Sequence, residues 1–195
     1  MSADFLSFLV FAVVGAFTPG PNNTIALATG VHFGARRVAP HALGTMLGFS
    51  SMLLLASAGA LAALLAMPGL EGALRALGVG YLLWLSWRLA TSHGPDGKAL
   101  SQPLAVWEST LIQFVSPKGW MLAISVAGTW FTTLAGQYAA LALHIVVFAL
   151  ICAASITLWA NVGGALQGWL AHPARLRLFN WTMGAALAAS AVSML

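Results

Sequence analysis

Six long apolar segments make up most of the chain, and each is long enough to cross a membrane. They cover approximately residues 4–33, 39–67, 71–91, 104–132, 137–169 and 174–195. A bilayer core is about 30 Å thick and takes about 20 apolar residues per helix. Because lipid offers the backbone no hydrogen-bond partners, each spanning segment must be helical. We therefore predict an all-α membrane protein, with six transmembrane helices in a single domain of residues 1–195.

Charged side chains are too scarce to cover a water-soluble fold. They make up 6% of the chain, with a mean hydropathy of +0.90, against about 25% charged residues in an average soluble domain. The net charge of +4 does not indicate nucleic-acid binding, because no basic cluster exceeds the pair Arg36-Arg37. The single cysteine, Cys152, cannot form an intrachain disulfide or a two-thiol redox relay, and we interpret it as a small buried hydrophobic residue.

The placement of basic residues predicts the orientation of the chain. The loops between spans 1–2, 3–4 and 5–6 share one side of the membrane, whereas the other side holds only Arg75. The basic residues on the shared side are Arg36, Arg37, Arg88, Lys98, Arg175 and Arg177. Since cytoplasmic loops carry an excess of Lys and Arg, we expect these loops to be cytoplasmic and both termini to lie outside. The first segment begins with the acidic Asp4, so we interpret it as a retained helix and not as a signal peptide.

A polar cytoplasmic linker, residues 92–103, divides the chain into halves of about 1–91 and 104–195. Each half has three spans, and the two halves have opposite topology. Inverted repeats of this kind are a transporter architecture. The pairs Thr18-Pro19 and Ser116-Pro117 lie 98 residues apart inside apolar segments, which supports the repeat. We expect helices 1 and 4 to be broken near mid-membrane.

The break in the first span is the sharpest motif. Its residues are Thr18, Pro19, Gly20, Pro21, Asn22 and Asn23. Two prolines remove two amide donors, and a broken helix inside a membrane is tolerated where it faces protein or a water-filled cavity. Pro21 suits the first turn of a new helix, whose free amides attract a carboxylate, and Asn22 and Asn23 add groups for an α-amino acid. The alternative is a kink used for packing, with the asparagines bonded to neighbouring helices.

The fourth span contains a second break, followed by a cation. Ser116 can cap a half-helix that begins at Pro117, and Lys118 follows directly. An ammonium group in the bilayer costs at least about 2.5–3.5 kcal/mol, so such residues usually bind a ligand, form a pair or line water. We interpret Lys118 as a binding residue. Snorkelling to the membrane surface is the alternative.

Other polar residues in the predicted spans give weaker indications. Glu108 is either an interfacial carboxylate or a gating or proton-carrying group, and His144 is either a packing residue or a proton relay. His41, Gln113 and Asn161 either line a path or bond neighbouring helices. No cluster of His, Cys, Asp and Glu in the sequence has metal-ligand spacing, so we predict no metal and no cofactor.

The chain matches the pattern of a known family at a Pro-Gly-Pro near residue 20 and at a Pro-Lys pair about a hundred residues later. Further short matches accompany these two. These matches are Ala26-Leu27-Ala28, Gly34, Leu47-Gly48-Phe49, Tyr81, Trp84-Leu85-Ser86-Trp87, Ala90-Thr91-Ser92 and Gln113-Phe114-Val115. On these residues the chain resembles, over essentially its whole length, the LysE/RhtB family of bacterial inner-membrane amino-acid exporters. Within that family it is most similar to the cysteine/O-acetylserine branch. The resemblance implies export driven by the proton gradient. In an inner membrane, the termini that the basic residues place outside are periplasmic.

Two positions depart from that family's pattern. Ser116 stands where many members have asparagine before the Pro-Lys pair. Phe49 stands where many members have an acidic residue after the helix-2 glycine, here Gly48. Without that carboxylate, few acids remain to receive a second ammonium group, which favours a small neutral substrate over a basic amino acid. If that carboxylate carries protons in other members, proton coupling here uses another group, for which Glu108, Lys118 and His144 are the candidates.

The sequence thus predicts an efflux transporter, and not an enzyme, for small neutral amino acids or derivatives, with cysteine and O-acetylserine foremost. We place the substrate between the two broken helices, and expect the two halves to rock around it in alternating access. The predicted substrate-binding residues are Pro19, Gly20, Pro21, Asn22, Asn23, Ser116, Pro117 and Lys118.

Within this arrangement Lys118 and the amides after Pro21 hold the substrate carboxylate. Asn22, Asn23 and carbonyls freed by the prolines hold its ammonium group. Protons and membrane lipid are the expected partners. The sequence leaves open whether the chain forms a homodimer. The alternatives are an exporter of another amino acid, such as homoserine, threonine or leucine, and a passive channel. A membrane enzyme or redox protein would need clustered ionisable residues or paired thiols, which the sequence lacks.

Overall fold

A computed structural model describes residues 3–59, 70–91, 102–131 and 138–192, and the secondary structure within these ranges is helical throughout. The α-helices are α1 (Ala3–Phe17), α2 (Pro21–Phe33), α3 (Ala39–Ser57), α5 (Leu70–Ala90), α6 (Val106–Phe114), α7 (Pro117–Trp130), α8 (Tyr138–Leu166) and α9 (Pro173–Val192). Two short 3₁₀-helices, η1 (Ala35–Val38) and η2 (Trp169–Ala171), lie before α3 and α9. The predicted all-α class is confirmed. The predicted linker, residues 92–103, lies mostly outside the described residues.

Both predicted helix breaks are present. The chain bends by 56° between α1 and α2, and two residues, Val115 and Ser116, separate α6 from α7. Within the described residues, Ala35–Ser57 and Tyr138–Leu166 are long and apolar enough to cross a membrane, and the bent α1–α2 pair makes a third candidate if it is one span. The six-span arrangement therefore stays a prediction.

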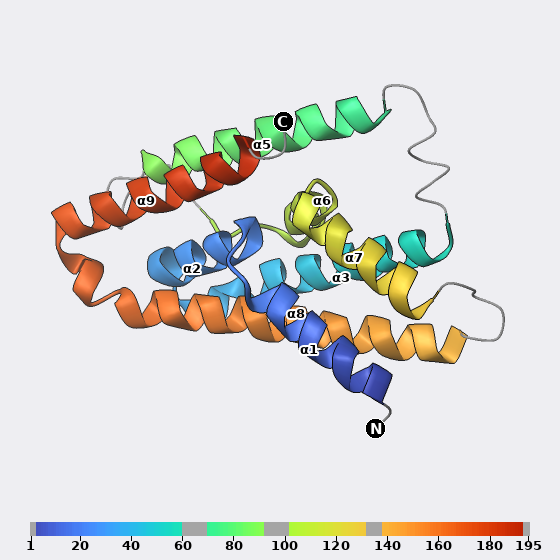
Figure 1. The fold of residues 1–195 in the computed structure, drawn as a ribbon. Helices are drawn as coiled ribbons and strands as arrows, with labels where there is room; N and C mark the ends of the chain where they lie inside the picture. Colours follow the sequence, from blue (N-terminus) through green and yellow to red (C-terminus); the bar gives the residue numbers. More distant parts are fainter. Residues whose placement is uncertain (1–2, 60–69, 92–101, 132–137, 193–195) are drawn as a thin grey trace.

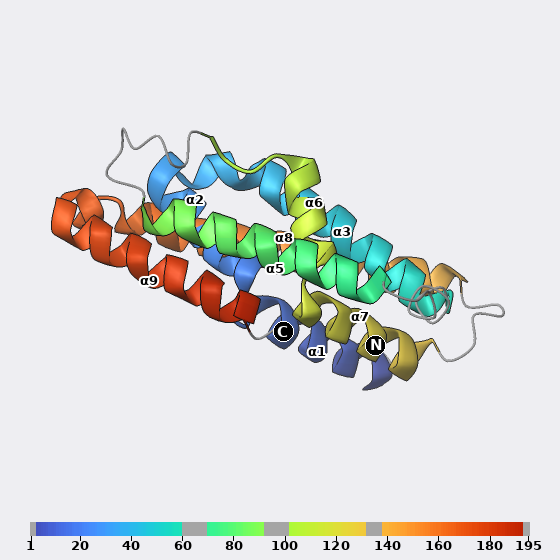
Figure 2. The same cartoon turned by 90° about the horizontal axis from the view of Figure 1, so that it is seen from above.

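The helices form antiparallel pairs that surround the two breaks. Helix α3 packs against α8, and α5 packs against α9 on the other side of α2 (Figures 1 and 2). Helices α1 and α7 lie together at the end of the molecule opposite the α8–α9 turn (Figure 1). The α2 half of the first broken helix thus lies between the longer helices, whereas α1 and α7 lie at one end of the molecule.

Glycines allow close approach at two of these crossings. A Cβ added at Gly30 of α2 would lie 2.0 Å from a backbone oxygen of α8. One added at Gly163 of α8 would lie 2.1 Å from the backbone oxygen of Leu27. Gly44 and Gly48 bring α3 against α6 in the same way. Small residues at helix interfaces are a common means of packing in membranes, where backbones must approach closely.

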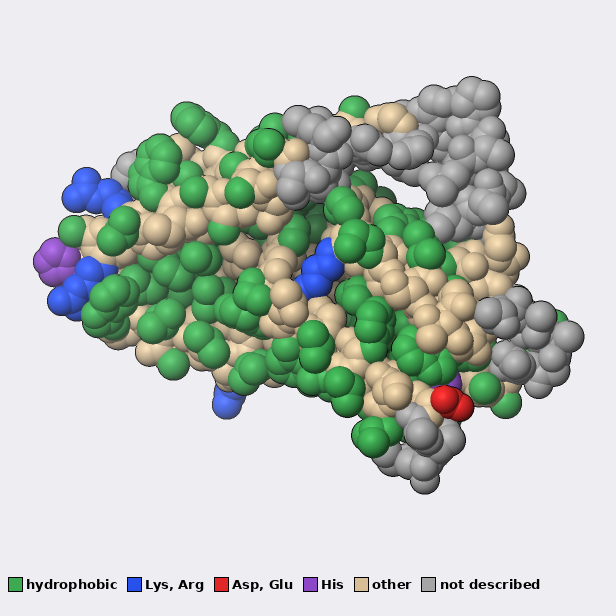
Figure 3. Space-filling view, in the orientation of Figure 1, with side chains coloured by type: hydrophobic (Ala, Val, Ile, Leu, Met, Phe, Trp, Pro, Cys, Tyr) green, Lys and Arg blue, Asp and Glu red, His purple; other side chains and the backbone are tan. Residues whose placement is uncertain are grey.

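The surface separates apolar from basic regions. Green apolar side chains cover much of the face in Figure 3, and blue Lys and Arg side chains gather at the end where α8 turns into α9. The exposed Arg36 and Arg37 of η1 and the exposed Arg175 and Arg177 of α9 belong to elements at this end. The basic loops expected on one side of the membrane therefore lie together where the structure describes them.

Candidate functional site

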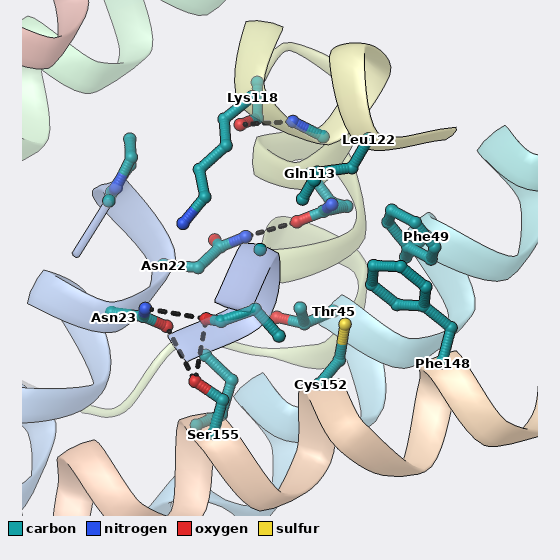
Figure 4. A pocket seen from close by; sticks show the side chains of 17 residues that line it. Asn22, Asn23, Thr45, Phe49, Gln113, Lys118, Leu122, Phe148, Cys152 and Ser155 are labelled. Atoms are coloured by element: carbon teal, nitrogen blue, oxygen red, sulfur yellow. Dashed lines mark hydrogen bonds between the residues drawn. The ribbon is translucent and has the colours of Figure 1, made fainter. Parts of the chain in front are cut away.

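The two helix breaks face each other across a small cavity (Figure 4). Its volume is about 50 Å³. One water needs roughly 10–15 Å³, so the cavity holds a few waters or a small solute. Six of the eight predicted substrate-binding residues line it, namely Gly20, Pro21, Asn22, Asn23, Ser116 and Lys118. The fold therefore brings together residues that lie about a hundred positions apart in the chain.

Lys118 reaches from α7 to the break in the first helix. Its ammonium group donates a hydrogen bond to the backbone oxygen of Thr18. A Cβ added at Gly20 would lie 3.3 Å from the Cδ and 3.4 Å from the Nζ of Lys118, so the side chain lies along the backbone of the break. An ammonium group has three donors. Among the described residues, the Thr18 bond takes one of them, which leaves two for an anion in the cavity.

The first turn of α2 adds further donors beside this ammonium group. Gly20 is the residue before the helix and is extended, with φ −167° and ψ 179°, and Pro21 occupies the first turn. The amides of Asn22 and Asn23 belong to this turn, where a helix offers no acceptor to its own N–H groups. Amides at a helix N-terminus together with a lysine form a site for a carboxylate.

Asn22 joins the two broken helices and also presents an unpaired acceptor. Its Nδ2 donates to Oε1 of Gln113, on the first half of the second broken helix. Its Oδ1 is buried and has no hydrogen-bond partner among the described residues. Most buried polar atoms in proteins are paired, so an orphaned acceptor in a cavity wall indicates a missing donor. An ammonium group would supply that donor.

Asn23 is held differently, because its amide binds the end of α1. Its Nδ2 donates to the backbone oxygens of Ala16, at 3.0 Å, and Thr18, at 2.9 Å. Ser155 of α8 donates to the same Ala16 oxygen at 2.9 Å. Asn23 thus braces the break itself, and its predicted contact with a substrate ammonium group stays a prediction.

Ser116 caps the second half-helix as the sequence predicts. Its Oγ accepts a hydrogen bond from the backbone N–H of Gly119 at 3.3 Å, and Pro117 occupies the first turn. The rings of Pro19 and Pro117 are exposed, and neither proline lines the cavity. These two prolines shape the backbone around the cavity and do not form part of its wall.

His41 and Gln113 tie the site together. The buried His41 of α3 donates from Nε2 to the backbone oxygen of Asn22, at 3.0 Å, and its Nδ1 lies 2.8 Å from Oγ of Ser109. His41 therefore bonds neighbouring helices, and Gln113 both bonds a neighbour and lines the cavity. Asn161 is exposed and donates to a carbonyl oxygen of its own helix.

Part of the cavity wall was not expected from the sequence. Thr45, Phe49, Phe148, Cys152 and Ser155 line it from α3 and α8. The rings of Phe49 and Phe148 stack with centroids 3.9 Å apart. Cys152 is buried, as expected. In a chain so rich in apolar residues, a polar residue inside an apolar helix, such as Thr45, was the available signal.

Two of the three proton-coupling candidates lie outside the cavity wall. The carboxylate of Glu108 accepts a hydrogen bond at 2.8 Å from the backbone N–H of Ala105, at the start of α6. The ring of His144 lies among phenylalanine rings, 4.2 Å from that of Phe8 between centroids. Of the three candidates, Lys118 is the one that lines the cavity.

An all-helical fold with an apolar surface and a polar cavity between two broken helices is the architecture of a membrane transporter. The LysE type translocator family matches residues 13–195 of the chain. A cysteine/O-acetylserine efflux protein of Salmonella paratyphi A is 34% identical over 164 residues, which are 84% of this chain and 82% of the relative. The protein of the same description from Escherichia coli K12 is 30% identical over 131 residues, 67% of each chain. No solved structure gives a significant match.

The chain belongs to the LysE family, and it is an efflux transporter and not an enzyme.

Proposed function

We propose that this protein exports small neutral amino acids or their derivatives across the bacterial inner membrane, with cysteine and O-acetylserine as the foremost substrates. The observation that carries the proposal is the meeting of Lys118, the first turn of α2 and the unpaired Oδ1 of Asn22 in one small cavity. This set matches the two charges of an amino-acid backbone. The relatives described as cysteine/O-acetylserine efflux proteins agree with it.

The binding mode follows from the charges of the wall. The substrate carboxylate binds the ammonium group of Lys118 and the amides of Asn22 and Asn23, and the substrate ammonium group binds Oδ1 of Asn22. Among the residues that the structure describes, those that line the cavity include one cation and no acid. A second ammonium group on the substrate would therefore be buried without a counter-charge, which disfavours lysine and arginine as substrates.

Transport in this proposal occurs by alternating access between six spans arranged as two inverted halves, with both termini periplasmic. The antiparallel pairs α3–α8 and α5–α9 support this arrangement, because each pairs the equivalent helices of the two halves. The proton gradient drives export, and Lys118 is the proton-carrying candidate because it lies in the cavity. The competing mechanism is a passive channel, and the experiment must distinguish it from proton-coupled export.

The test uses purified protein in liposomes, with labelled cysteine and O-acetylserine and with labelled lysine and leucine for comparison, with and without an imposed pH gradient. We expect uphill movement of the first pair. A channel would give downhill movement only, and movement of none would refute the substrate assignment.

Lys118→Met tests the site in the same liposomes. A hydrogen bond to a charged group contributes about 1.5–3 kcal/mol, so transport efficiency should fall about 10- to 150-fold. Arg177→Met, which removes an exposed cation of α9, is the matched control and should transport normally. Unchanged export by Lys118→Met would refute the proposed role of the ammonium group.

A further inference from the structure

The hydroxyl group of Thr45 is buried in the cavity wall without a partner. Thr45 is 4% exposed, and its Oγ1 has no hydrogen-bond partner among the described residues. Hydroxyl groups on helices usually bond the carbonyl oxygen four residues earlier, as Thr18, Ser51 and Thr110 do in this chain. Thr45 lies inside α3, yet does not form that bond. A buried hydroxyl group without a partner is destabilising, so the vacancy points to a ligand.

The position of Thr45 relates this hydroxyl group to one part of the substrate. Figure 4 shows Thr45 between Asn22 and Gln113 on one side and Cys152 and the two phenylalanine rings on the other. Lys118 lies beyond Asn22 in the same view. A substrate held by its carboxylate at Lys118 and by its ammonium group at Asn22 therefore directs its side chain towards Thr45.

The wall beyond Thr45 limits the size of that side chain. The ring of Phe49 stacks on that of Phe148 at an interplanar angle of 18°, and both phenylalanines are at most 1% exposed. Their packing leaves no freedom for either ring to move aside without opening the core around them. This end of the cavity thus combines a fixed apolar wall with the free hydroxyl group of Thr45.

We propose that Thr45, backed by Phe49 and Phe148, forms the side-chain subsite and selects amino acids with an oxygen or sulfur atom at the γ position. The inference rests on the proposed function and adds the side-chain atom of the substrate that the transporter recognises. Threonine Oγ1 can donate to the ester oxygen of O-acetylserine and can donate to or accept from the hydroxyl of serine or the thiol of cysteine. Alanine leaves the hydroxyl group unpaired, and an aliphatic side chain such as that of leucine offers it no hydrogen-bonding atom.

The test compares substrates in liposomes that contain purified wild type, Thr45→Val or Thr45→Ser. Valine keeps the shape of threonine and removes its hydroxyl group, whereas serine keeps the hydroxyl group. One neutral hydrogen bond corresponds to about a 2- to 10-fold change. We expect the ratio of the KM for serine or O-acetylserine to the KM for alanine to rise by that factor in Thr45→Val. In Thr45→Ser the ratio should stay near that of wild type.

A stability measurement separates this role from a structural one. Thr45→Val removes an unpaired buried hydroxyl group, so the ligand-free variant should melt at a higher temperature than wild type. Thr110→Val removes a hydroxyl group that lies within 3.1 Å of the Gly44 oxygen and 2.9 Å of the Val106 oxygen, so it should melt lower and leave the KM ratio unchanged. An unchanged ratio in Thr45→Val, with wild type transporting these substrates, overturns the subsite alone. Wild type that transports none of them overturns the proposed function and the subsite together.

Discussion

Replacing Gly163 by alanine tests the helix crossing that positions the cavity. Helices α2 and α8 touch there, and the new Cβ would lie 2.1 Å from the backbone oxygen of Leu27, where ordinary Cβ contacts begin near 3.4 Å. The obstacle is backbone and cannot rotate away, so the helices must part by about 1.3 Å. A gap of about 0.5–1 Å already removes a quarter to a half of a dispersion contact. Overpacking of this kind costs about 1–3 kcal/mol.

This free energy corresponds to about a 5- to 150-fold change in the unfolding equilibrium constant. Reversible unfolding in detergent micelles, followed by circular dichroism, measures it. Gly128→Ala is the matched control, because no described atom beyond the adjacent backbone of its own helix lies within 4 Å of its added Cβ. There alanine should be neutral or slightly stabilising, since it forms helix better than glycine. Equal unfolding free energies for the two variants would refute the close approach of α2 and α8.

Three further variants test individual hydrogen bonds, each through the unfolding free energy in detergent. Asn23→Ala removes the amide that binds the end of α1 and should cost about 1–3 kcal/mol, whereas the exposed Asn161→Ala should cost much less; equal losses would contradict the bracing role. Ser116→Ala removes a helix cap and should cost about 1 kcal/mol, with Ser116→Asp retaining most of it; an alanine variant as stable as wild type would contradict the cap. His41→Leu leaves the carbonyl oxygen of Asn22 without its buried donor and should cost about 1–3 kcal/mol; no loss would show that this bond does not contribute.

The sequence predicts the two breaks well because their causes are local. Pro19 and Pro21 cannot donate to the preceding turn, and Ser116 with Pro117 forms a cap from adjacent residues. The cation at Lys118 is also visible in the sequence, because its charge contrasts with an apolar segment. The repeat predicts that these features meet in one site. In the structure, residues of both breaks line the same cavity.

The rest of the cavity wall depends on tertiary contacts, which the local sequence does not indicate. Phe49 and Phe148 lie 99 residues apart, and nothing in the sequence indicates that their rings stack until α3 and α8 pack together. Asn23 resembles Asn22 in the sequence, yet one braces the backbone and the other presents a free oxygen. Only the angle between α1 and α2 decides which amide faces the end of α1. Side-chain roles at a helix break therefore depend on the bend as well as on residue type.

Several side-chain hydrogen bonds around the cavity join the first half of the chain to the second. They include the bonds that link Lys118 to Thr18, Asn22 to Gln113, and His41 to Ser109. Rocking of one half against the other must break such bonds, and a ligand shifts a conformational equilibrium only through contacts that differ between the states. Under the proposed mechanism, a substrate carboxylate that binds the two remaining donors of Lys118 competes with the Thr18 oxygen for the same ammonium group, which weakens one of these bonds. The substrate ammonium group binds the free Oδ1 of Asn22, and the bond from Asn22 to Gln113 stays in place. Substrate binding therefore weakens one contact that holds the empty transporter in this conformation, and movement of the halves is coupled to the presence of cargo.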